Sequence, residues 1–143
     1  MEEGTFIVEE TYPANASRVW KAITDKDQMK VWYFNMEEFK PEVGFEFRFW
    51  GGPAEDRQYL HICRITEVIP EKKLVHSWEY EGYEGSTLVS FELFEEDGNR
   101  TRLKLSHHGL DNFPKENPDF AQANFAEGWT SIIGTSLKNF LNK

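Results

Sequence analysis

Cysteine is almost absent from this sequence, since Cys63 is the only one in 143 residues. An intramolecular disulfide is therefore excluded, which is typical of proteins from a reducing compartment. Long apolar runs are missing too, because no stretch approaches the roughly 18 residues of a membrane-spanning helix. The acidic start, residues 1–4, also lacks the apolar segment of a signal peptide. We therefore expect a cytoplasmic protein that does not insert into a membrane.

Positive charge is scarce as well. The 16 Lys and Arg residues are outnumbered by 25 Asp and Glu residues, which gives a formal net charge of -9. Nucleic acids and anionic membranes repel an acidic surface, so both are excluded as main partners. The carboxylates occur mostly in charged runs such as residues 95–97, which are ordinarily solvated. This composition favours a soluble protein.

Motifs for catalysis and for cofactor binding are missing from the sequence. It contains no Gly-x-Ser-x-Gly nucleophile motif and no glycine-rich phosphate loop. One cysteine and four scattered histidines do not provide the ligand spacing of a zinc site. We therefore expect no metal and no cofactor, and we expect Cys63 to be inert in the middle of a strand.

Strand patterns are frequent in the remaining sequence. Glycine and proline separate them, and Gly51-Gly52-Pro53 predicts a break, so residues 51–57 are expected to form a loop. An Asp97-Gly98 pair is typical of a hairpin turn. Segments rich in β-branched, aromatic or alternating apolar residues are predicted as strands: residues 5–12, 45–50, 59–69, 74–80, 87–93 and 101–107.

Two short helices are expected after the first strand, one capped by Asn15 and one by Asp25. A longer helix is expected over residues 117–143, because its first residues, Asn-Pro-Asp, suit a helix N-terminus. Gly128 and Gly134 lie inside it and predict a kink or the close approach of another element. The apolar residues of this helix share one broad face: Phe125, Trp129, Ile132, Ile133, Leu137 and Phe140.

This order of elements predicts an α+β fold. A curved antiparallel sheet is expected to wrap around the long C-terminal helix, because both have large apolar faces to bury. The two short helices follow the first strand. We find no internal repeat and no linker, and the length suits a single domain over residues 1–143.

The surface between the sheet and the C-terminal helix is predicted to be rich in aromatic residues. It could line a cavity for a flat or elongated apolar molecule, or it could close into a filled core. The pattern alone favours the filled core, because aromatic faces are usually buried in this way. Strand alternation and helical phase place twelve residues on this surface: Trp32, Phe47, Phe49, Trp78, Tyr80, Phe91, Leu93, Leu105, His107, Phe125, Trp129 and Ile133.

His107 is predicted to point inward, whereas His108 points to the opposite side of the sheet. His107 or Tyr80 could orient a ligand through a hydrogen bond, and His107 could also exchange a proton with it. A structural histidine at a strand end is the favoured interpretation of His107. His76 could oppose Glu67 across a hairpin, and a cross-strand polar pair would explain both residues without a functional role.

Five stretches of the sequence occur in an order that resembles a known family: residues 19–25 (VWKAITD) followed by Trp32, residues 44–48 (GFEFR), residues 67–78 (EVIPEKKLVHSW), residues 99–110 (NRTRLKLSHHGL), and Gly128-Trp129. In this order they resemble the heat-shock-protein-90 ATPase activator (Aha-type) homologue family. That family lies in the START-like superfamily, also called SRPBCC, of polyketide cyclases and lipid-transport proteins. The resemblance covers most of the chain, from about residue 5 to residue 142.

The resemblance implies a helix-grip fold with an apolar cavity between the sheet and the C-terminal helix. It therefore favours a ligand cavity over the filled core that the pattern alone predicts. The leading expectation is a monomeric, non-enzymatic protein that binds a small hydrophobic molecule such as a lipid, a polyketide or a flavonoid-like aromatic. One alternative is a chaperone-interaction module that stimulates an ATPase of the heat-shock-protein-90 type. Another is a cyclase or hydrolase that works inside the cavity.

Overall fold

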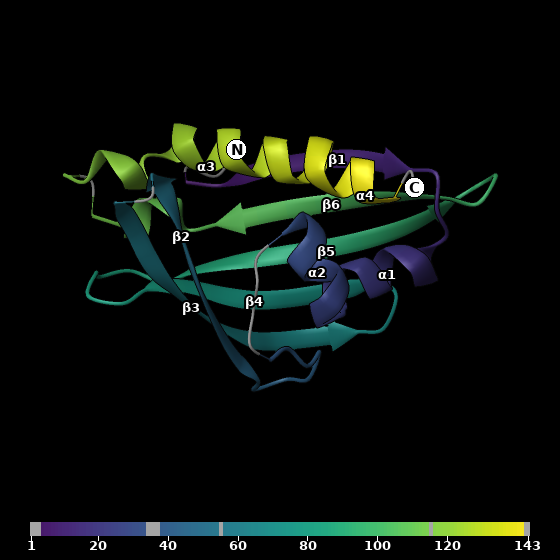
Figure 1. Cartoon of the computed structure of the whole chain (residues 1–143), viewed down its shortest axis with the longest axis horizontal. Helices are drawn as coiled ribbons and strands as arrows, with labels where there is room; N and C mark the ends of the chain where they lie inside the picture. Colours follow the sequence, from purple (N-terminus) through teal and green to yellow (C-terminus); the bar gives the residue numbers. More distant parts are fainter. Residues whose placement is uncertain (1–3, 34–37, 55, 115, 142–143) are drawn as a thin grey trace.

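The computed structural model describes residues 4–33, 38–54, 56–114 and 116–141. Six strands form one antiparallel sheet in the order β1-β6-β5-β4-β3-β2, and the helices lie over one face of it (Figure 1). The predicted α+β helix-grip architecture is therefore confirmed. The strands are β1 (Phe6–Tyr12), β2 (Glu46–Ala54), β3 (Arg57–Ile69), β4 (Lys73–Tyr80), β5 (Thr87–Glu96) and β6 (Arg100–His108).

Two short helices, α1 (Ala16–Thr24) and α2 (Lys26–Trp32), follow β1 as predicted. The long C-terminal helix consists of α3 (Gln122–Ser131), a π-helical turn η3 (Ile132–Ser136) and α4 (Leu137–Leu141). Short 3-10 turns occur before it, at η1 (Leu110–Asn112) and η2 (Pro118–Phe120). No helix in the described parts of the chain is long and apolar enough to cross a membrane.

Strand alternation assigns the two faces of the sheet. On β4, the side chains of Leu74, His76, Trp78 and Tyr80 are all buried towards the helices. On β5 and β6, Phe91 and Leu105 lie opposite each other on the same buried face. The predicted inward phase of these strands is therefore confirmed, and this face supplies most of the apolar core.

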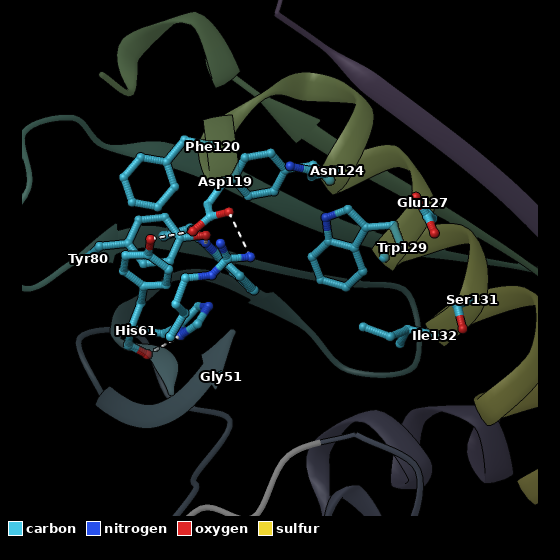
Figure 2. Close-up of a pocket in the computed structure, with 15 residues that line it drawn as sticks. Gly51, His61, Tyr80, Asp119, Phe120, Asn124, Glu127, Trp129, Ser131 and Ile132 are labelled. Atoms are coloured by element: carbon cyan, nitrogen blue, oxygen red, sulfur yellow. Dashed lines mark hydrogen bonds and ion pairs between the residues drawn. The ribbon is translucent and has the colours of Figure 1, made fainter. Parts of the chain in front are cut away.

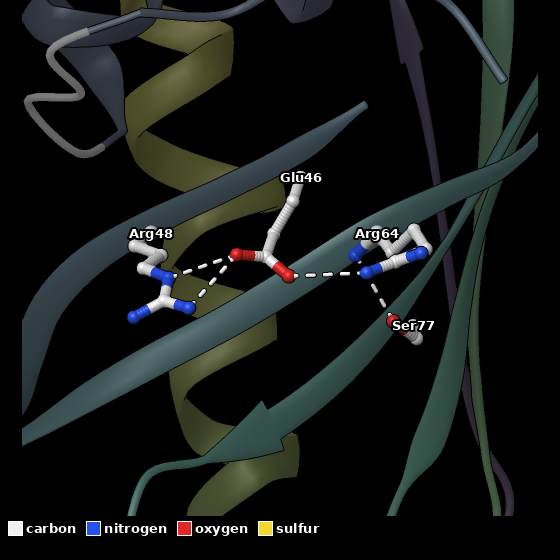
Figure 3. Close-up of polar contacts among 4 residues, drawn as sticks. All are labelled: Glu46, Arg48, Arg64 and Ser77. Atoms are coloured by element: carbon white, nitrogen blue, oxygen red, sulfur yellow. Dashed lines mark hydrogen bonds and ion pairs between the residues drawn. The ribbon is translucent and has the colours of Figure 1, made fainter. Parts of the chain in front are cut away.

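The other face of the sheet carries ion pairs. The Glu46 carboxylate on β2 lies 2.9 Å from the Arg48 guanidinium and 3.4 Å from that of Arg64 on β3 (Figure 3). The hydrogen bond from Arg48 is the main cause that lowers the pKa of Glu46. The backbone N–H of Arg64 donates to the Ser77 hydroxyl at 3.0 Å. These contacts bind β2, β3 and β4 together where solvent screens them, so each adds at most about 1 kcal/mol.

The predicted break at Gly51-Gly52-Pro53 is wrong, because β2 continues to Ala54. Gly51 pairs with Tyr59 and Ala54 pairs with Arg57, so the register shifts by one residue between the two pairs. A β-bulge accounts for this shift: glycine and proline are tolerated where one strand carries an extra residue. Of the expected loop, residues 51–54 belong to β2 and Arg57 begins β3, while residue 55 lies outside the described residues.

A second register shift contradicts the predicted pair of His76 and Glu67. His76 lies opposite Ile65, and Glu67 lies opposite Val75. Glu67 instead forms an ion pair with Lys73 at 3.6 Å. The imidazole of His76 is buried against Phe47, with 5.0 Å between the ring centroids, and its Nδ1 lies 2.8 Å from the Ser77 carbonyl oxygen.

The C-terminal helix begins later than predicted. The Asn117 side chain accepts a hydrogen bond from the Asp119 N–H and so caps only η2, while Ala121 precedes α3. The buried residues of the helix recur at every fourth position: Phe125, Trp129, Ile133, Leu137 and Leu141. A regular α-helix turns about 100° per residue, so each step of four overshoots the buried face by about 40°. The wider π-helical turn compensates for this drift.

The π-helical turn is held against the sheet by Tyr12. Its buried hydroxyl donates to the Ile133 carbonyl oxygen at 2.6 Å, which joins the end of β1 to the middle of the helix. An Ala methyl at Gly134 would lie 3.9 Å from the Glu10 carboxylate, which is an ordinary contact. Close approach therefore does not explain Gly134, and the predicted kink corresponds to this turn.

The Asn15 cap leads to a first prediction. The Asn15 side-chain oxygen accepts from the Arg18 N–H at 2.9 Å, whereas Asp25 makes no such bond to α2. Asn15→Ala should therefore lower the free energy of unfolding by about 1 kcal/mol, and Asp25→Ala by clearly less. Urea unfolding of the two variants compares them directly. Equal losses would contradict the assignment of these caps.

Candidate functional site

A pocket of about 560 Å³ lies between the sheet and the start of the C-terminal helix (Figure 2). Several lining residues, including Asn124, Gly128 and Ser131, are exposed, so the pocket opens to solvent. Asp119 lies near one end in Figure 2, while Trp129 and Ile132 lie towards the other. The described residues that line it are Gly51, Arg57, Tyr59, His61, Trp78, Tyr80, Asp119, Phe120, Asn124, Phe125, Glu127, Gly128, Trp129, Ser131 and Ile132.

The sheet supplies one wall of the pocket through neighbouring strands. Tyr59 and His61 are two residues apart on β3, and Trp78 and Tyr80 are two residues apart on β4. The two side chains of each pair therefore project from the same face of the sheet. His61 lies directly opposite Tyr80 in the ladder. The rings therefore form a continuous surface, with 4.7 Å between the centroids of His61 and Tyr80.

The helix supplies the opposite wall. Asn124, Gly128 and Ile132 follow one another at intervals of four residues, and so do Phe125 and Trp129. Residues four apart lie on one side of a helix, which brings this set to the pocket. This wall therefore combines the large aromatic rings of Phe125 and Trp129 with Gly128, which has no side chain.

Aromatic contacts join lining residues of the pocket to one another. The rings of Tyr80 and Phe120 lie nearly parallel, with 4.6 Å between centroids and 17° between planes. Trp78 and Trp129 meet at 5.5 Å and 59° across the sheet–helix gap. The Trp78 indole N–H also donates to the Tyr80 hydroxyl at 2.9 Å, which fixes both rings.

A polar contact closes one side of the opening. The Tyr59 hydroxyl donates to the Asp119 carboxylate at 2.6 Å, and the Arg57 guanidinium lies 3.6 Å from the same carboxylate. The bond to Asp119 raises the pKa of the Tyr59 phenol, because the carboxylate stabilises its protonated form. Asn117 donates to the Tyr59 hydroxyl at 3.3 Å. The start of the helical segment is thereby tied to β3.

His61 is the titratable group buried in the sheet wall. Its ring stacks on Phe49 at 4.5 Å, and its Nδ1 lies 3.0 Å from the Tyr59 carbonyl oxygen. Because a carbonyl oxygen only accepts, Nδ1 carries the proton in this contact. Burial lowers the pKa of His61 to about 4. The imidazole is therefore neutral near neutral pH and adds no positive charge to the pocket.

His107 lies behind the pocket, in a buried chain of hydrogen bonds. The Trp129 indole N–H donates to His107 Nδ1 at 3.0 Å, and His107 Nε2 lies 2.6 Å from the Thr87 hydroxyl. An indole N–H is only a donor, so Nδ1 must be unprotonated and Nε2 must donate to Thr87. The Thr87 hydroxyl donates in turn to the Trp78 carbonyl oxygen at 3.3 Å. His107 thus holds the two tryptophans of the pocket in place.

Four of the predicted residues line the pocket: Trp78, Tyr80, Phe125 and Trp129. Trp32, Phe47 and Phe91 surround a second space of only about 10 Å³, which is room for no more than about one water molecule. The remaining residues of the predicted set are buried and line neither space: Phe49, Leu93, Leu105, His107 and Ile133. The inward surface is therefore filled over most of its length and open at one end.

The alternation of β3 could have revealed Tyr59 and His61, because both share the inward phase of Cys63. No pattern in the sequence places Phe120 or Asp119 there, since η2 precedes the periodic part of the helix. No group of three or more His, Cys, Asp or Glu that could hold a metal ion occurs in the described ranges. The pocket can therefore offer apolar contact and a few hydrogen bonds.

Comparison with solved structures shows the same fold in several proteins. DynU16, a protein of the dynemicin biosynthetic locus, is 20% identical, with a TM-score of 0.79 over 99% of this chain and 48% of its own. MLL2253 from Mesorhizobium loti is 23% identical, with a TM-score of 0.78 over 96% of both chains. CalU16 from Micromonospora echinospora is 23% identical, with a TM-score of 0.73 over 96% of this chain and 75% of its own. The chain spans about half the length of DynU16.

Sequence comparison adds the family. None of the curated proteins matches this chain. The model of one family, described as "Activator of Hsp90 ATPase homolog 1-like protein", matches residues 13–142, which is most of the chain. The protein therefore belongs to this family of the START-like type.

Proposed function

We propose that this protein binds a small hydrophobic molecule, such as a lipid, a polyketide or a flavonoid-like aromatic, in the pocket between the sheet and α3. The observation that carries this proposal is the pocket of about 560 Å³ with aromatic walls. Pockets for small molecules typically measure about 300–1,000 Å³ and combine apolar walls with few polar groups. Each 100 Å² of apolar ligand surface buried there would contribute about 2.5 kcal/mol.

Two polar groups of the pocket, Asp119 and His61, favour binding over catalysis. The Asp119 carboxylate is engaged by Tyr59 and Arg57, and His61 is neutral and bonded through Nδ1. A general acid or base needs a group that is free to reach the substrate and titrates near the working pH. These residues are better placed to orient a ligand than to transform it.

The tryptophan indole N–H signals provide an experiment with internal controls. Trp78 and Trp129 line the pocket, whereas Trp20, Trp32 and Trp50 do not. In a ¹H–¹⁵N titration with flat aromatics and medium-chain lipids, a binding molecule should shift the signals of Trp78 and Trp129. The other three signals should stay in place. A screen in which no compound moves Trp78 or Trp129 would reject the proposal.

The family suggests a second candidate, contact with a chaperone of the heat-shock-protein-90 type. One surface observation favours it: the Trp50 side chain on the edge strand β2 is 63% exposed, and an exposed aromatic residue is a common anchor at protein interfaces. Under this alternative, Trp50→Ala would weaken stimulation of the chaperone ATPase, and ligands of the pocket would have no effect on it.

A further inference from the structure

The charges that line the pocket do not balance. Among the described lining residues, the charged side chains are Arg57, Asp119 and Glu127, and the Arg57 guanidinium is paired with Asp119 at 3.6 Å. Among the described residues no cation pairs with Glu127, which lies on the exposed side of α3 at the pocket wall. The neutral imidazole of His61 offers no compensation. A ligand in the pocket therefore meets one uncompensated negative charge.

The net charge of the chain acts in the same direction. A formal net charge of -9 attracts cations and repels carboxylates during association. Arg57 is the cation among the described lining residues, and the Asp119 carboxylate already offsets its charge. Both effects disfavour an anionic ligand.

The helix wall has a gap at Gly128. No other element lies within 4 Å of a Cβ built there, so packing within the protein does not require a glycine at this position. Glycine weakens a helix interior, and its presence therefore calls for another reason. Because Gly128 lines the pocket, its missing side chain leaves the helix backbone open to a ligand beside the Trp129 ring.

The pocket that contains this gap is also lined by aromatic rings. Tyr80 and Phe120 stack nearly in parallel at 4.6 Å, and Tyr59 meets Phe120 at 5.1 Å. Flat aromatic molecules gain from offset or edge contacts with such rings. Positively charged groups gain further from the negative faces of the rings. A flexible acyl chain gains only the apolar area.

We propose that the pocket selects flat aromatic molecules that are neutral or positively charged, seated against α3 at Gly128, and disfavours carboxylates such as fatty acids. Glu127 sets this charge preference. The inference rests on the proposed function, because it names the class of ligand that the same pocket takes.

Three anthracene probes of nearly equal size test the charge preference: neutral anthracene-9-methanol, cationic 9-(aminomethyl)anthracene and anionic anthracene-9-carboxylate. Fluorescence titration at neutral pH and low salt gives a Kd for each, and hexadecanoate is tested by competition. One charge a few ångströms away in a solvent-accessible site changes affinity by about five- to tenfold. We therefore expect the cation and the neutral probe to bind at least about fivefold more tightly than the carboxylate.

Glu127→Gln should reduce the preference for the cation over the carboxylate by about fivefold, because the nearby charge is gone while the net charge of the chain and the rings remain. Glu79→Gln is the matched control, since it removes the same charge from the exposed outer side of β4. This control should keep the fivefold preference. Salt at about 1 M should also reduce the preference in the unmodified chain, since it screens charges beyond about 3 Å.

The possible outcomes separate the two proposals. If the carboxylate or hexadecanoate binds as tightly as the cation, the charge preference is wrong while the binding function stands. If Glu79→Gln abolishes the preference as fully as Glu127→Gln, the effect comes from the whole protein and the role of Glu127 is wrong. If no probe binds and no tryptophan signal moves, the binding function itself is rejected.

Discussion

Gly128→Leu should weaken ligand binding roughly 50- to 100-fold while the protein stays folded. The leucine side chain would project from α3 into the pocket, where a Cβ meets no other element. A ligand displaced from about 100 Å² of apolar contact loses about 2.5 kcal/mol, which corresponds to this change in Kd. Titration with anthracene-9-methanol measures the change.

The stability of this variant distinguishes a blocked pocket from a damaged fold. Leucine favours a helix over glycine by up to about 1 kcal/mol, so the free energy of unfolding should rise or stay constant. Gly128→Ala should stabilise the helix similarly and change binding only slightly. Thr130→Leu places the same bulk on an exposed residue of α3 outside the pocket and should leave binding unchanged. Normal binding by Gly128→Leu would show that the ligand lies elsewhere.

Mild acid should destabilise this protein before most of its carboxylates are protonated. Burial lowers the pKa of His61 and of His76 to about 4, and lowers that of His107 to about 3. Each of the three would titrate near its ordinary value of about 6.5 in the unfolded chain. The unfolded state therefore binds more protons than the folded state between about pH 6.5 and pH 4. The stability that depends on these three neutral histidines is fully present above this range and is lost as the pH falls through it.

The expected decrease in the free energy of unfolding at mildly acidic pH is large. From about pH 6.5 to pH 5, each buried histidine should remove roughly 1–2 kcal/mol, so the three together remove roughly 3–6 kcal/mol. That is a considerable part of the 5–15 kcal/mol typical of a domain. Urea unfolding at several pH values measures the free energy, and its slope against pH counts the protons taken up on unfolding.

Two substitutions test this origin. His76→Phe keeps an aromatic ring beside Phe47 and removes one titrating group, so the pH slope should fall by about one third. His61→Phe keeps a ring beside Phe49 and removes a second titrating group, so it should lower the slope by a similar amount. A slope that is the same in His76→Phe as in the unmodified chain would show that the buried histidines are not responsible.

Most of the sheet could be predicted from the sequence, because its strands alternate between apolar and polar residues. Leu74, His76, Trp78 and Tyr80 repeat on β4 with a period of two, and that period alone determines their face. The positions of the β-bulges could not be predicted. A one-residue shift in pairing does not change the apolar–polar pattern of either strand enough to be recognised. Gly51 was therefore predicted to end β2, and Glu67 was predicted to lie opposite His76.

The pocket was predicted only in part, and the reason is geometric. Phase along an element predicts that Trp78 and Trp129 point inward, but it does not predict whether the space between them is filled. That depends on which side chains of other elements enter the space. Phe91 on β5 points inward like Trp78 on β4, yet it lines a space of only about 10 Å³ that Trp32 of α2 also lines.

The π-helical turn limits how the length of this chain can change. Phe125 and Trp129 precede the turn and face the pocket or His107, whereas Leu137 and Leu141 follow it and are buried in the core. Deleting one residue elsewhere in the helix would rotate everything after it by about 100°. A π-helical turn already holds one residue more than a regular α-helical turn, so losing a residue there restores an unbroken α-helix and keeps Leu137 and Leu141 on the buried face. Loss of one residue is thus tolerable in this stretch of five residues and disruptive in the rest of the helix.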